Sequence, residues 1–191
     1  MTAVARSFPS LSRRDLASRT RQVLSRGGRG NPDVLLVESD RGPVVVKDFG
    51  GRGYWVRRWW GPWLLRREAL AFERLDGLEA VPRLLGRLDA AALVFEYRPG
   101  TLLSRSLAGR LPADFLPRLQ RAITDMHLRG VVHLDLRHRS NILADREGRP
   151  VLIDFGSALR FDPSTWWGRA GVALLGRVDR GALQKWRVRL G

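Results

Sequence analysis

The stretch VVHLDLRHRSNIL, residues 131–143, places a short polar loop between two apolar runs. A histidine, an aspartate and an asparagine, His133, Asp135 and Asn141, follow one another in this loop. Two of the three histidines of the chain lie here, in a sequence otherwise dominated by arginine, leucine and glycine. Because a solvated surface loop would be the simplest interpretation, the rest of the chain decides whether this loop has a function.

The composition indicates a folded chain. Its 191 residues are enough for one domain, or for a small domain of two lobes, with a core of its own. Apolar residues make up 44% of the sequence, which argues against disorder. The absence of cysteine excludes disulfides, thiolate metal sites and a cysteine nucleophile. We expect a cytoplasmic protein, because no apolar run resembles a secretory signal or approaches the ~20 residues of a membrane-spanning helix.

The net charge of +15 is the strongest deviation in composition, and arginine carries almost all of it. Such a charge favours polyanionic partners, namely nucleic acid, anionic lipid surfaces and phosphorylated or acidic substrates, or it reflects a GC-rich genome. Lysine occurs twice, as Lys47 and Lys185. The retention of lysine at the end of the apolar run PVVVK, residues 43–47, points to a site that requires a compact ammonium.

The expected elements are strands, a helix, strands and then mostly helix, which predicts an α+β class. Two β-rich runs, 33–38 and 43–47, flank a turn sequence and predict a hairpin. Apolar residues at helical spacing predict a helix over 63–75, and the run 93–95 is typical of a short buried strand. The same criteria predict a helix over 112–130, a strand over 150–153 and a helix over 164–190.

Five polar side chains in these elements could act together. Lys47 ends a strand, and Glu68 lies in the following helix, where it could pair with the ammonium. Asp135 and Asn141 share one loop, and Asp154 begins another loop after a strand. Oxygen ligands from separate loops suit Mg²⁺, and a further carboxylate can orient a hydroxyl nucleophile. A lysine for phosphate, ligands for magnesium and a base for the acceptor are the components of a phosphoryl-transfer site.

Taken in order, these motifs resemble those of protein-kinase-like phosphotransferases from about residue 22 to residue 160. The matching motifs are the third-strand lysine (PVVVK, 43–47), the helix C glutamate (Arg67-Glu68), the hinge (LVFEYRPG, 93–100), the catalytic loop (His133-Leu134-Asp135 with Asn141) and the metal-binding DFG (154–156). The chain is most similar in character to compact bacterial kinases, namely RIO-type serine/threonine kinases and lipopolysaccharide-core sugar kinases such as Kdo kinase. Each residue also has a simple structural interpretation, but five motifs in the right order favour the joint functional one.

The resemblance implies a two-lobed fold with a β-rich N-lobe, residues 21–97, and a minimal helical C-lobe, residues 98–191. The preceding basic segment, residues 1–20, is expected to be loose or helical at the surface. ATP and Mg²⁺ are the implied cofactors, bound between the lobes. By position, the implied residues are Lys47, Glu68, Glu96, Arg98 and Leu143 for ATP, Asp135 as catalytic base with Arg137 near the transferred phosphate, and Asn141 and Asp154 for the metal.

Three features depart from the kinase pattern. Asn141 lies six residues after Asp135 instead of five, so the loop must bulge for it to reach the metal. Leu134 stands where kinases controlled by an activation-loop phosphate have arginine. No clear G-x-G-x-x-G is present, and the segment 27–30 (GGRG) is the candidate substitute. Leu134 agrees with control that does not run through such a phosphate. The weak phosphate cover and the lengthened loop are typical of a pseudokinase, whereas retention of the lysine, base and metal ligands argues for activity.

We therefore expect transfer of the γ-phosphate of ATP to a hydroxyl of a protein serine or threonine or of a sugar or glycolipid. The alternatives are a pseudokinase that binds nucleotide without turnover and a basic nucleic-acid-associated module. The Trp- and Arg-rich segment 54–63 either packs against the protein, contacts an anionic membrane surface or, less favoured, stacks on nucleic-acid bases. Membrane contact would place the protein at the inner face of the membrane.

Overall fold

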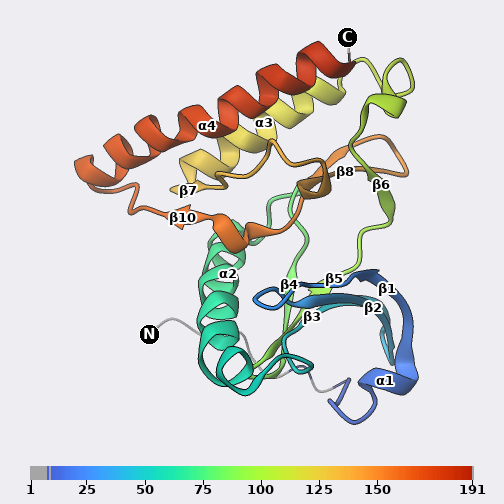
Figure 1. The fold of residues 1–191 in the computed structure, drawn as a ribbon. Coiled ribbons are helices and arrows are strands. Elements are labelled where there is room, and N and C mark those ends of the chain that lie inside the picture. Colours follow the sequence, from blue (N-terminus) through green and yellow to red (C-terminus); the bar gives the residue numbers. More distant parts are fainter. Residues whose placement is uncertain (1–7, 9, 191) are drawn as a thin grey trace. The chain divides into compact units, whose positions relative to one another are not determined.

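The computed structural model describes Phe8 and residues 10–190 and contains two compact units (Figure 1). The first unit comprises the described residues up to Glu73 together with Arg83–Tyr97. The second comprises Arg74–Pro82 and the residues from Arg98 onward. Strands and helices occur in both units, so the predicted α+β class is confirmed and is compatible with a kinase-like fold.

The first unit is built on a five-stranded antiparallel sheet in the order β1-β2-β3-β5-β4. Its strands are β1 (Thr20–Ser25), β2 (Asp33–Ser39), β3 (Gly42–Asp48), β4 (Leu84–Asp89) and β5 (Ala92–Glu96). β2 and β3 form the predicted hairpin, in which Gly42 adopts a φ of 99° that glycine tolerates best. β5 confirms the short strand predicted at 93–95, whereas β1 and β4 were not predicted.

Every second residue of β3 and β5 points to the same face of this sheet, and that face carries apolar residues from both strands. Val44 and Val46 share a core cluster with three residues from before β1, namely Phe8, Leu11 and Leu16. Leu16 begins the short helix α1 (Leu16–Arg19). The expectation that this segment lies at the surface is therefore wrong for these three residues, because the apolar face of the sheet needs a cover.

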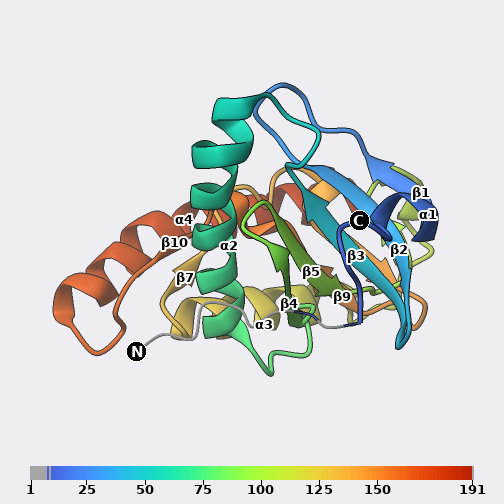
Figure 2. The ribbon, with the colours of Figure 1, turned by 90° about the horizontal axis from the view of Figure 1, so that it is seen from below.

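Helix α2 (Gly61–Leu75) lies along the other face of the sheet (Figure 2) and agrees with the helix predicted over 63–75. Its Phe72 ring packs against Phe95 of β5 with ring centroids 4.7 Å apart. Leu65 and Ala69, one turn apart, are fully buried on the same side of the helix. This face of the sheet also carries Lys47, because side chains alternate along β3.

A π-helical turn, η1 (Val56–Trp60), precedes α2 and carries large aromatic side chains on its surface. Four tryptophans here have exposed fractions between 49% and 73%; they are Trp55, Trp59, Trp60 and Trp63. The expectation that this segment packs against the protein is therefore wrong for these residues. Trp186, by contrast, is buried in the second unit.

The second unit combines two long helices with two small sheets. Helices α3 (Phe115–Leu128) and α4 (Trp166–Leu190) pack side by side (Figure 1) and confirm the helices predicted over 112–130 and 164–190. Gly130, with a φ of 73°, follows α3 and ends it. The strands are β6 (Gly100–Leu102), β8 (Ile142–Asp145) and β9 (Pro150–Leu152) in one sheet, and β7 (Val131–Val132) and β10 (Leu159–Arg160) in the other.

Short 3-10 turns complete this unit at η2 (Arg105–Leu107), η3 (Arg139–Asn141) and η4 (Phe155–Ser157). β9 corresponds to the strand predicted over 150–153. Within the described part of the chain, no helix combines the length and the apolar character needed to cross a membrane.

Candidate functional site

Lys47 and Glu68 form a buried ion pair in the first unit. Lys47 lies near the end of β3, and its Nζ is 2.5 Å from Oε1 of Glu68 on α2. The two residues are 8% and 4% exposed, and the ammonium also lies 5.9 Å from the centroid of the Phe95 ring. Burial reduces screening by solvent, so the carboxylate holds the ammonium in one position. The structure thus brings together two residues that the sequence predicted to pair.

Asp135 and Asn141 meet in the loop after β7, despite the extra residue between them. The Asn141 Nδ2 group donates to the backbone oxygen and to Oδ2 of Asp135, both at 2.8 Å. Two tight turns absorb the additional residue, because His138 N donates to Asp135 O and Asn141 N donates to His138 O, each at 3.2 Å. The bulge expected from the spacing is therefore a turn followed by η3, and it keeps the amide beside the carboxylate.

His133 braces this loop against the segment that carries Asp154. Its Nε2 lies 3.0 Å from the carbonyl oxygen of Ile153, and its Nδ1 lies 3.4 Å from Asp135 N. Because a carbonyl oxygen only accepts, Nε2 carries the proton and Nδ1 is the acceptor. The ring also packs on Phe155, with centroids 4.7 Å apart.

Burial lowers the pKa of His133, although the Ile153 carbonyl and the carboxylates of Asp179, Asp154 and Asp135 favour its charged form. The neutral ring is therefore the form that fits this position, where it is 0% exposed. The same electrostatic influences indicate that both predicted functional carboxylates, Asp135 and Asp154, lie near the imidazole.

Asp154 is exposed and has a left-handed backbone, with φ 64° and ψ 71°. Aspartate tolerates this region better than most residues, and such conformations are concentrated at functional sites. The preceding residue, Ile153, donates its N–H to the carbonyl oxygen of Asn141 at 3.0 Å. Since the Ile153 carbonyl accepts from His133, Ile153 joins the start of the segment 154–156 to the loop 131–143 through both its N–H and its carbonyl.

Asp179 of α4 anchors the loop 131–143, and the sequence did not single it out. Its side chain is 0% exposed and accepts from the backbone N–H groups of His133 and Leu134, both at 2.9 Å. His127 Nε2 lies 3.0 Å from the same carboxylate. Leu134 has a φ of 70°, an unfavourable conformation for a leucine that the two hydrogen bonds around it hold in place. The available signal was that Asp179 is the sole acidic residue from 163 to 191.

Two more residues of α4 bind carbonyl oxygens of the same loop. The buried Trp186 donates its indole N–H to Leu136 O at 3.0 Å, and Lys185 Nζ donates to Arg137 O at 2.6 Å. Burial lowers the pKa of Lys185, and the neighbouring Arg189 and Arg137 lower it further. The second of the two lysines of the chain thus supports the loop whose aspartate and asparagine were the first candidates.

The remaining predicted residues are placed as follows. Glu96 ends β5, where its N–H donates to Arg83 O at 2.9 Å and its Oε2 accepts from Arg83 N at 3.0 Å. Arg98 lines a hollow of about 410 Å³ within the second unit. Leu143 is half-buried in β8 opposite Val151, and Arg137 is exposed.

The glycine-rich segment 27–30 is tied to the start of β2. Gly27 N donates to the Asp33 carboxylate at 2.9 Å, and Arg52 donates to Gly27 O at 3.0 Å and also pairs with Asp33. A Cβ atom at Gly27 would lie 2.3 Å from Asn31 O, so this position requires glycine. The segment is therefore an ordered loop.

The chemistry of the donors suits a magnesium ion. Asn141 offers an amide oxygen and Asp154 a carboxylate, and Mg²⁺ prefers a few such hard oxygens together with phosphate and water. The Asn141 oxygen accepts from Ser140 Oγ at 3.0 Å. No three His, Cys, Asp or Glu side chains converge on a common point among the residues that the structure describes.

Comparison with known proteins gives partial similarities, and no family model matches the chain. Citron Rho-interacting kinase of Homo sapiens is 42% identical over 77 residues, which are 37% of this chain and 4% of that protein. A probable serine/threonine-protein kinase of Arabidopsis thaliana is 32% identical over 137 residues, or 61% of this chain and 24% of that protein. The probable SapB synthase of Streptomyces coelicolor is 33% identical over 135 residues, or 60% of this chain and 14% of that protein.

The chain thus spans less than a quarter of the length of each of these relatives. Two of them are named as kinases, in agreement with the order of motifs along this sequence. The similarity supports a kinase-like family and is consistent with phosphotransferase activity in general.

Proposed function

We propose that this protein is an ATP- and Mg²⁺-dependent phosphotransferase that moves the γ-phosphate to a hydroxyl acceptor. The observation that carries the proposal is the loop arrangement of the second unit, where the Asn141 amide is fixed against Asp135 and Ile153 joins Asp154 to the same loop. The buried Lys47–Glu68 pair supports it, because an ammonium held by a carboxylate suits the phosphates of a nucleotide. The partial similarity to protein kinases points the same way.

In the proposed reaction, the acceptor hydroxyl oxygen forms a bond to the γ-phosphorus while Asp135 takes its proton. The bond from the γ-phosphorus to the bridging oxygen breaks, and the electron pair leaves with ADP. Lys47 neutralises charge on the α- and β-phosphates, and Glu68 keeps its ammonium in place. Asn141 and Asp154 would hold the magnesium ion, which supplies further charge neutralisation when bound.

The same proposal assigns the other predicted residues to supporting roles. The backbone of Glu96 and Arg98 would hold adenine, and Leu143 would pack beneath its ring. Arg137 would lie near the transferred phosphate. Charge placement and positioning, without a covalent intermediate, are how phosphoryl transfer is generally catalysed.

For the acceptor we propose a serine or threonine of a protein or a sugar hydroxyl of a lipopolysaccharide-type glycolipid. These are the acceptors of the RIO-type and Kdo kinases that the sequence resembles. The net charge of +15 favours an acceptor that carries negative charge. We further propose that the protein works in the cytoplasm, at the inner face of the membrane.

The test is ADP release by the purified protein with ATP and Mg²⁺, compared with Asp135→Asn and Asp154→Asn. We expect each substitution to lower turnover by about 100-fold or more, because the base or a metal ligand is lost. Asp114→Asn is the matched control, since Asp114 is an exposed carboxylate of the same unit that pairs with Arg118. Full turnover by Asp135→Asn would overturn the proposal.

A pseudokinase is the second candidate, and the contacts of Asn141 favour it. This amide donates to Asp135, and its oxygen accepts from Ser140, so a protein hydroxyl competes with a metal ion for that oxygen. A pseudokinase predicts that ATP raises the unfolding temperature without turnover above that of Asp154→Asn. Turnover that depends on Asp135 and Asp154 would exclude it.

A further inference from the structure

The segment that leads into α2 presents aromatic rings that phosphotransfer does not use. Tyr54, Trp55, Trp59, Trp60 and Trp63, here called the aromatic ridge, are between 49% and 73% exposed. The four tryptophans, with Val56, line one shallow hollow. Single exposed apolar residues are ordinary, but a contiguous patch of large rings marks an interaction surface.

A π turn gathers these rings on one side. Gly61 N donates to Val56 O, which places one extra residue in the helical repeat. Trp55, Trp59 and Trp63 can therefore recur along one face, with Trp60 beside them. Pro62 follows Gly61 and has no N–H to donate, which interrupts the regular ladder where the π turn lies.

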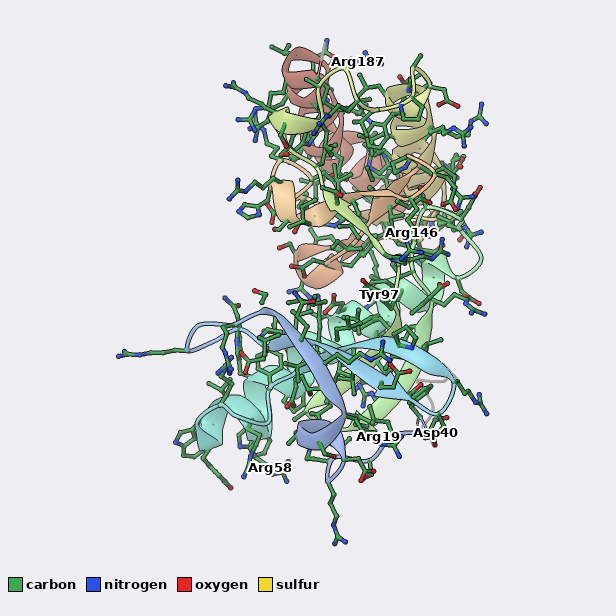
Figure 3. The ribbon with its side chains drawn as sticks, turned by 90° about the vertical axis from the view of Figure 1, so that its right-hand side faces the viewer. Arg19, Asp40, Arg58, Tyr97, Arg146 and Arg187 are labelled. Atoms are coloured by element: carbon green, nitrogen blue, oxygen red, sulfur yellow. The ribbon has the colours of Figure 1, made fainter. Side chains whose placement is uncertain are left out.

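The opposite side of this turn is closed against the protein. A Cβ atom at Gly61 would come 2.6 Å from the ring of Phe49, which is 1% exposed. Leu65, one turn later, is also 1% exposed. Burial on this side leaves the ridge facing outward, and Figure 3, where Arg58 is labelled, shows side chains of this region projecting away from the ribbon.

The rings of the ridge are in contact with one another. Trp60 and Trp63 stack with centroids 5.2 Å apart, and Tyr54 meets Trp55 edge to face at 5.4 Å. Arg58 lies 5.2 Å from the centroid of the Trp59 ring, which adds a cation–π contact. The ridge is therefore largely preformed, which lowers the entropic cost of binding.

The stretch of sequence that contains the aromatic ridge carries only positive charges. From Phe49 to Arg67 the chain contains five arginines and no aspartate or glutamate. One of them, Arg52, pairs with Asp33 inside the unit. The other four are Arg57, Arg58, Arg66 and Arg67, and the Arg67 guanidinium lies 5.0 Å from the centroid of the Trp63 ring.

We propose that the aromatic ridge and these four arginines form a docking surface for anionic phospholipid membranes. Tryptophan and tyrosine favour the membrane–water interface, where the apolar ring is buried and the polar edge stays hydrated. The guanidinium groups of neighbouring arginines are attracted to the negatively charged headgroups. Stacking on single-stranded nucleic acid fits less well, because Trp60 and Trp63 are already stacked on each other. The inference concerns the first unit alone and does not rest on the proposed phosphotransfer.

Vesicle binding without nucleotide tests the inference, with phosphatidylcholine vesicles compared to vesicles containing about 30% phosphatidylglycerol. The test variant combines Trp55→Ser, Trp59→Ser and Trp63→Ser, and we expect it to lower affinity for the anionic vesicles by about tenfold or more. The matched control combines Trp166→Ser and Trp167→Ser, since these rings are 57% and 69% exposed in the second unit. Arg57→Gln with Arg58→Gln should weaken binding to the anionic vesicles and reduce its dependence on salt.

Circular dichroism and thermal unfolding establish that each variant is folded, and a bromolipid that quenches tryptophan emission reports insertion of the unmodified ridge. Binding of the unmodified protein that the ridge variant loses and the control retains would support the proposal. No binding to anionic vesicles, no quenching, or equal binding by the ridge variant would overturn it. Ridge-dependent binding to polyuridylate RNA without vesicle binding would overturn it in favour of nucleic acid.

Discussion

Lys47 and Glu68 in the first unit face each other from a strand and a helix, whereas Asp135, Asn141 and Asp154 in the second unit lie on loops. The first pair needs only the regular geometry of β3 and α2 to meet, and both residues are buried. The second set has left-handed backbone at Asp154 and at the neighbouring Leu134. A regular strand and helix hold the Lys47–Glu68 pair. The second set lies on irregular backbone, which other groups have to hold in place.

Those other groups come from far along the chain. Asp179, Lys185 and Trp186 of α4 all bind backbone atoms of the loop, at His133, Leu134, Leu136 and Arg137. Hydrogen bonds to an unfavourable backbone stabilise it only while the partners remain buried and aligned. The comparison teaches that the loop residues of the second unit depend on polar contacts to distant residues of the chain. The Lys47–Glu68 pair depends on the packing of β3 against α2.

The largest expected effect on stability is that of Asp179→Ala. The change removes the shared acceptor of two N–H groups, at His133 and Leu134, in a site that is 0% exposed. We expect the free energy of unfolding to fall by about 4 kcal/mol, as for loss of a buried charge with its hydrogen bonds. Hydrogen exchange should show loss of protection over 131–143 and little change in the first unit. An effect no larger than that of Asp114→Ala would refute the anchoring role.

The next largest effect is expected at Lys47. Lys47→Met leaves the Glu68 carboxylate, 4% exposed, without its ion-pair partner and should lower the free energy of unfolding by about 3 kcal/mol. The double variant Lys47→Met with Glu68→Leu should lose about 2 kcal/mol less than the sum of the single changes, because no buried charge remains. Denaturant unfolding of all four proteins measures the coupling, and purely additive losses would contradict a stabilising pair.

An intermediate effect is expected from pH, and it distinguishes the units because all three histidines lie in the second. Burial lowers the pKa of His133 below its ordinary value of 6.5, so near pH 6 the unfolded chain binds a proton that the folded chain does not. Stability is therefore unaffected above 6.5 and falls as pH decreases from 6.5 toward the lowered pKa. The slope is at most about 1.4 kcal/mol per pH unit.

The measurement is denaturant unfolding between pH 7.5 and 5.5, with His133→Gln and the exposed His138→Gln compared. We expect the slope to flatten in His133→Gln and to persist in His138→Gln. The same slope in all three proteins would mean that another group causes it.

The smallest expected effect is that of Arg13→Leu in the first unit. Arg13 pairs with Asp48 at 2.9 Å and also with Asp89, and these contacts raise the pKa of its guanidinium. Since the Arg13 side chain is 37% exposed, solvent and salt screen the pairs, and we expect a loss of about 1 kcal/mol or less. The loss should shrink in high salt, and Arg14→Leu is the neighbouring control. A loss as large as that for Lys47→Met would show that burial does not determine how much an ion pair contributes to the free energy of unfolding.

Local patterns were sufficient to predict much of the fold. The β-rich runs 33–38 and 43–47 around a turn sequence correspond to the β2–β3 hairpin, and the helical spacing over 63–75 to α2. The same patterns anticipated that Lys47 and Glu68 would meet. β1 and β4 could not be predicted in this way, because no residue of β1 is fully buried and β4 is interrupted by Gly86.

The features that were missed depend on contacts between distant residues. No local pattern indicates that Asp179 binds a loop 46 residues earlier. The sequence alone does not distinguish a buried aspartate in a helix from an exposed one. Composition also does not predict whether a side chain points into the core or toward solvent. Trp59 and Trp186 both lie among arginines, yet one is 62% exposed and the other 1%.

The position of Asp179 affects the order in which parts of the protein become structured during synthesis. His133 leaves the ribosome 46 residues before Asp179, a delay of about 2–9 s at ordinary elongation rates of about 5–20 residues per second. In that interval all the residues of the first unit, which ends at Tyr97, have already been made. A nascent chain can thus pair Lys47 with Glu68 while the loop 131–143 still lacks its anchors, and we expect that loop to become ordered only after α4 has been translated.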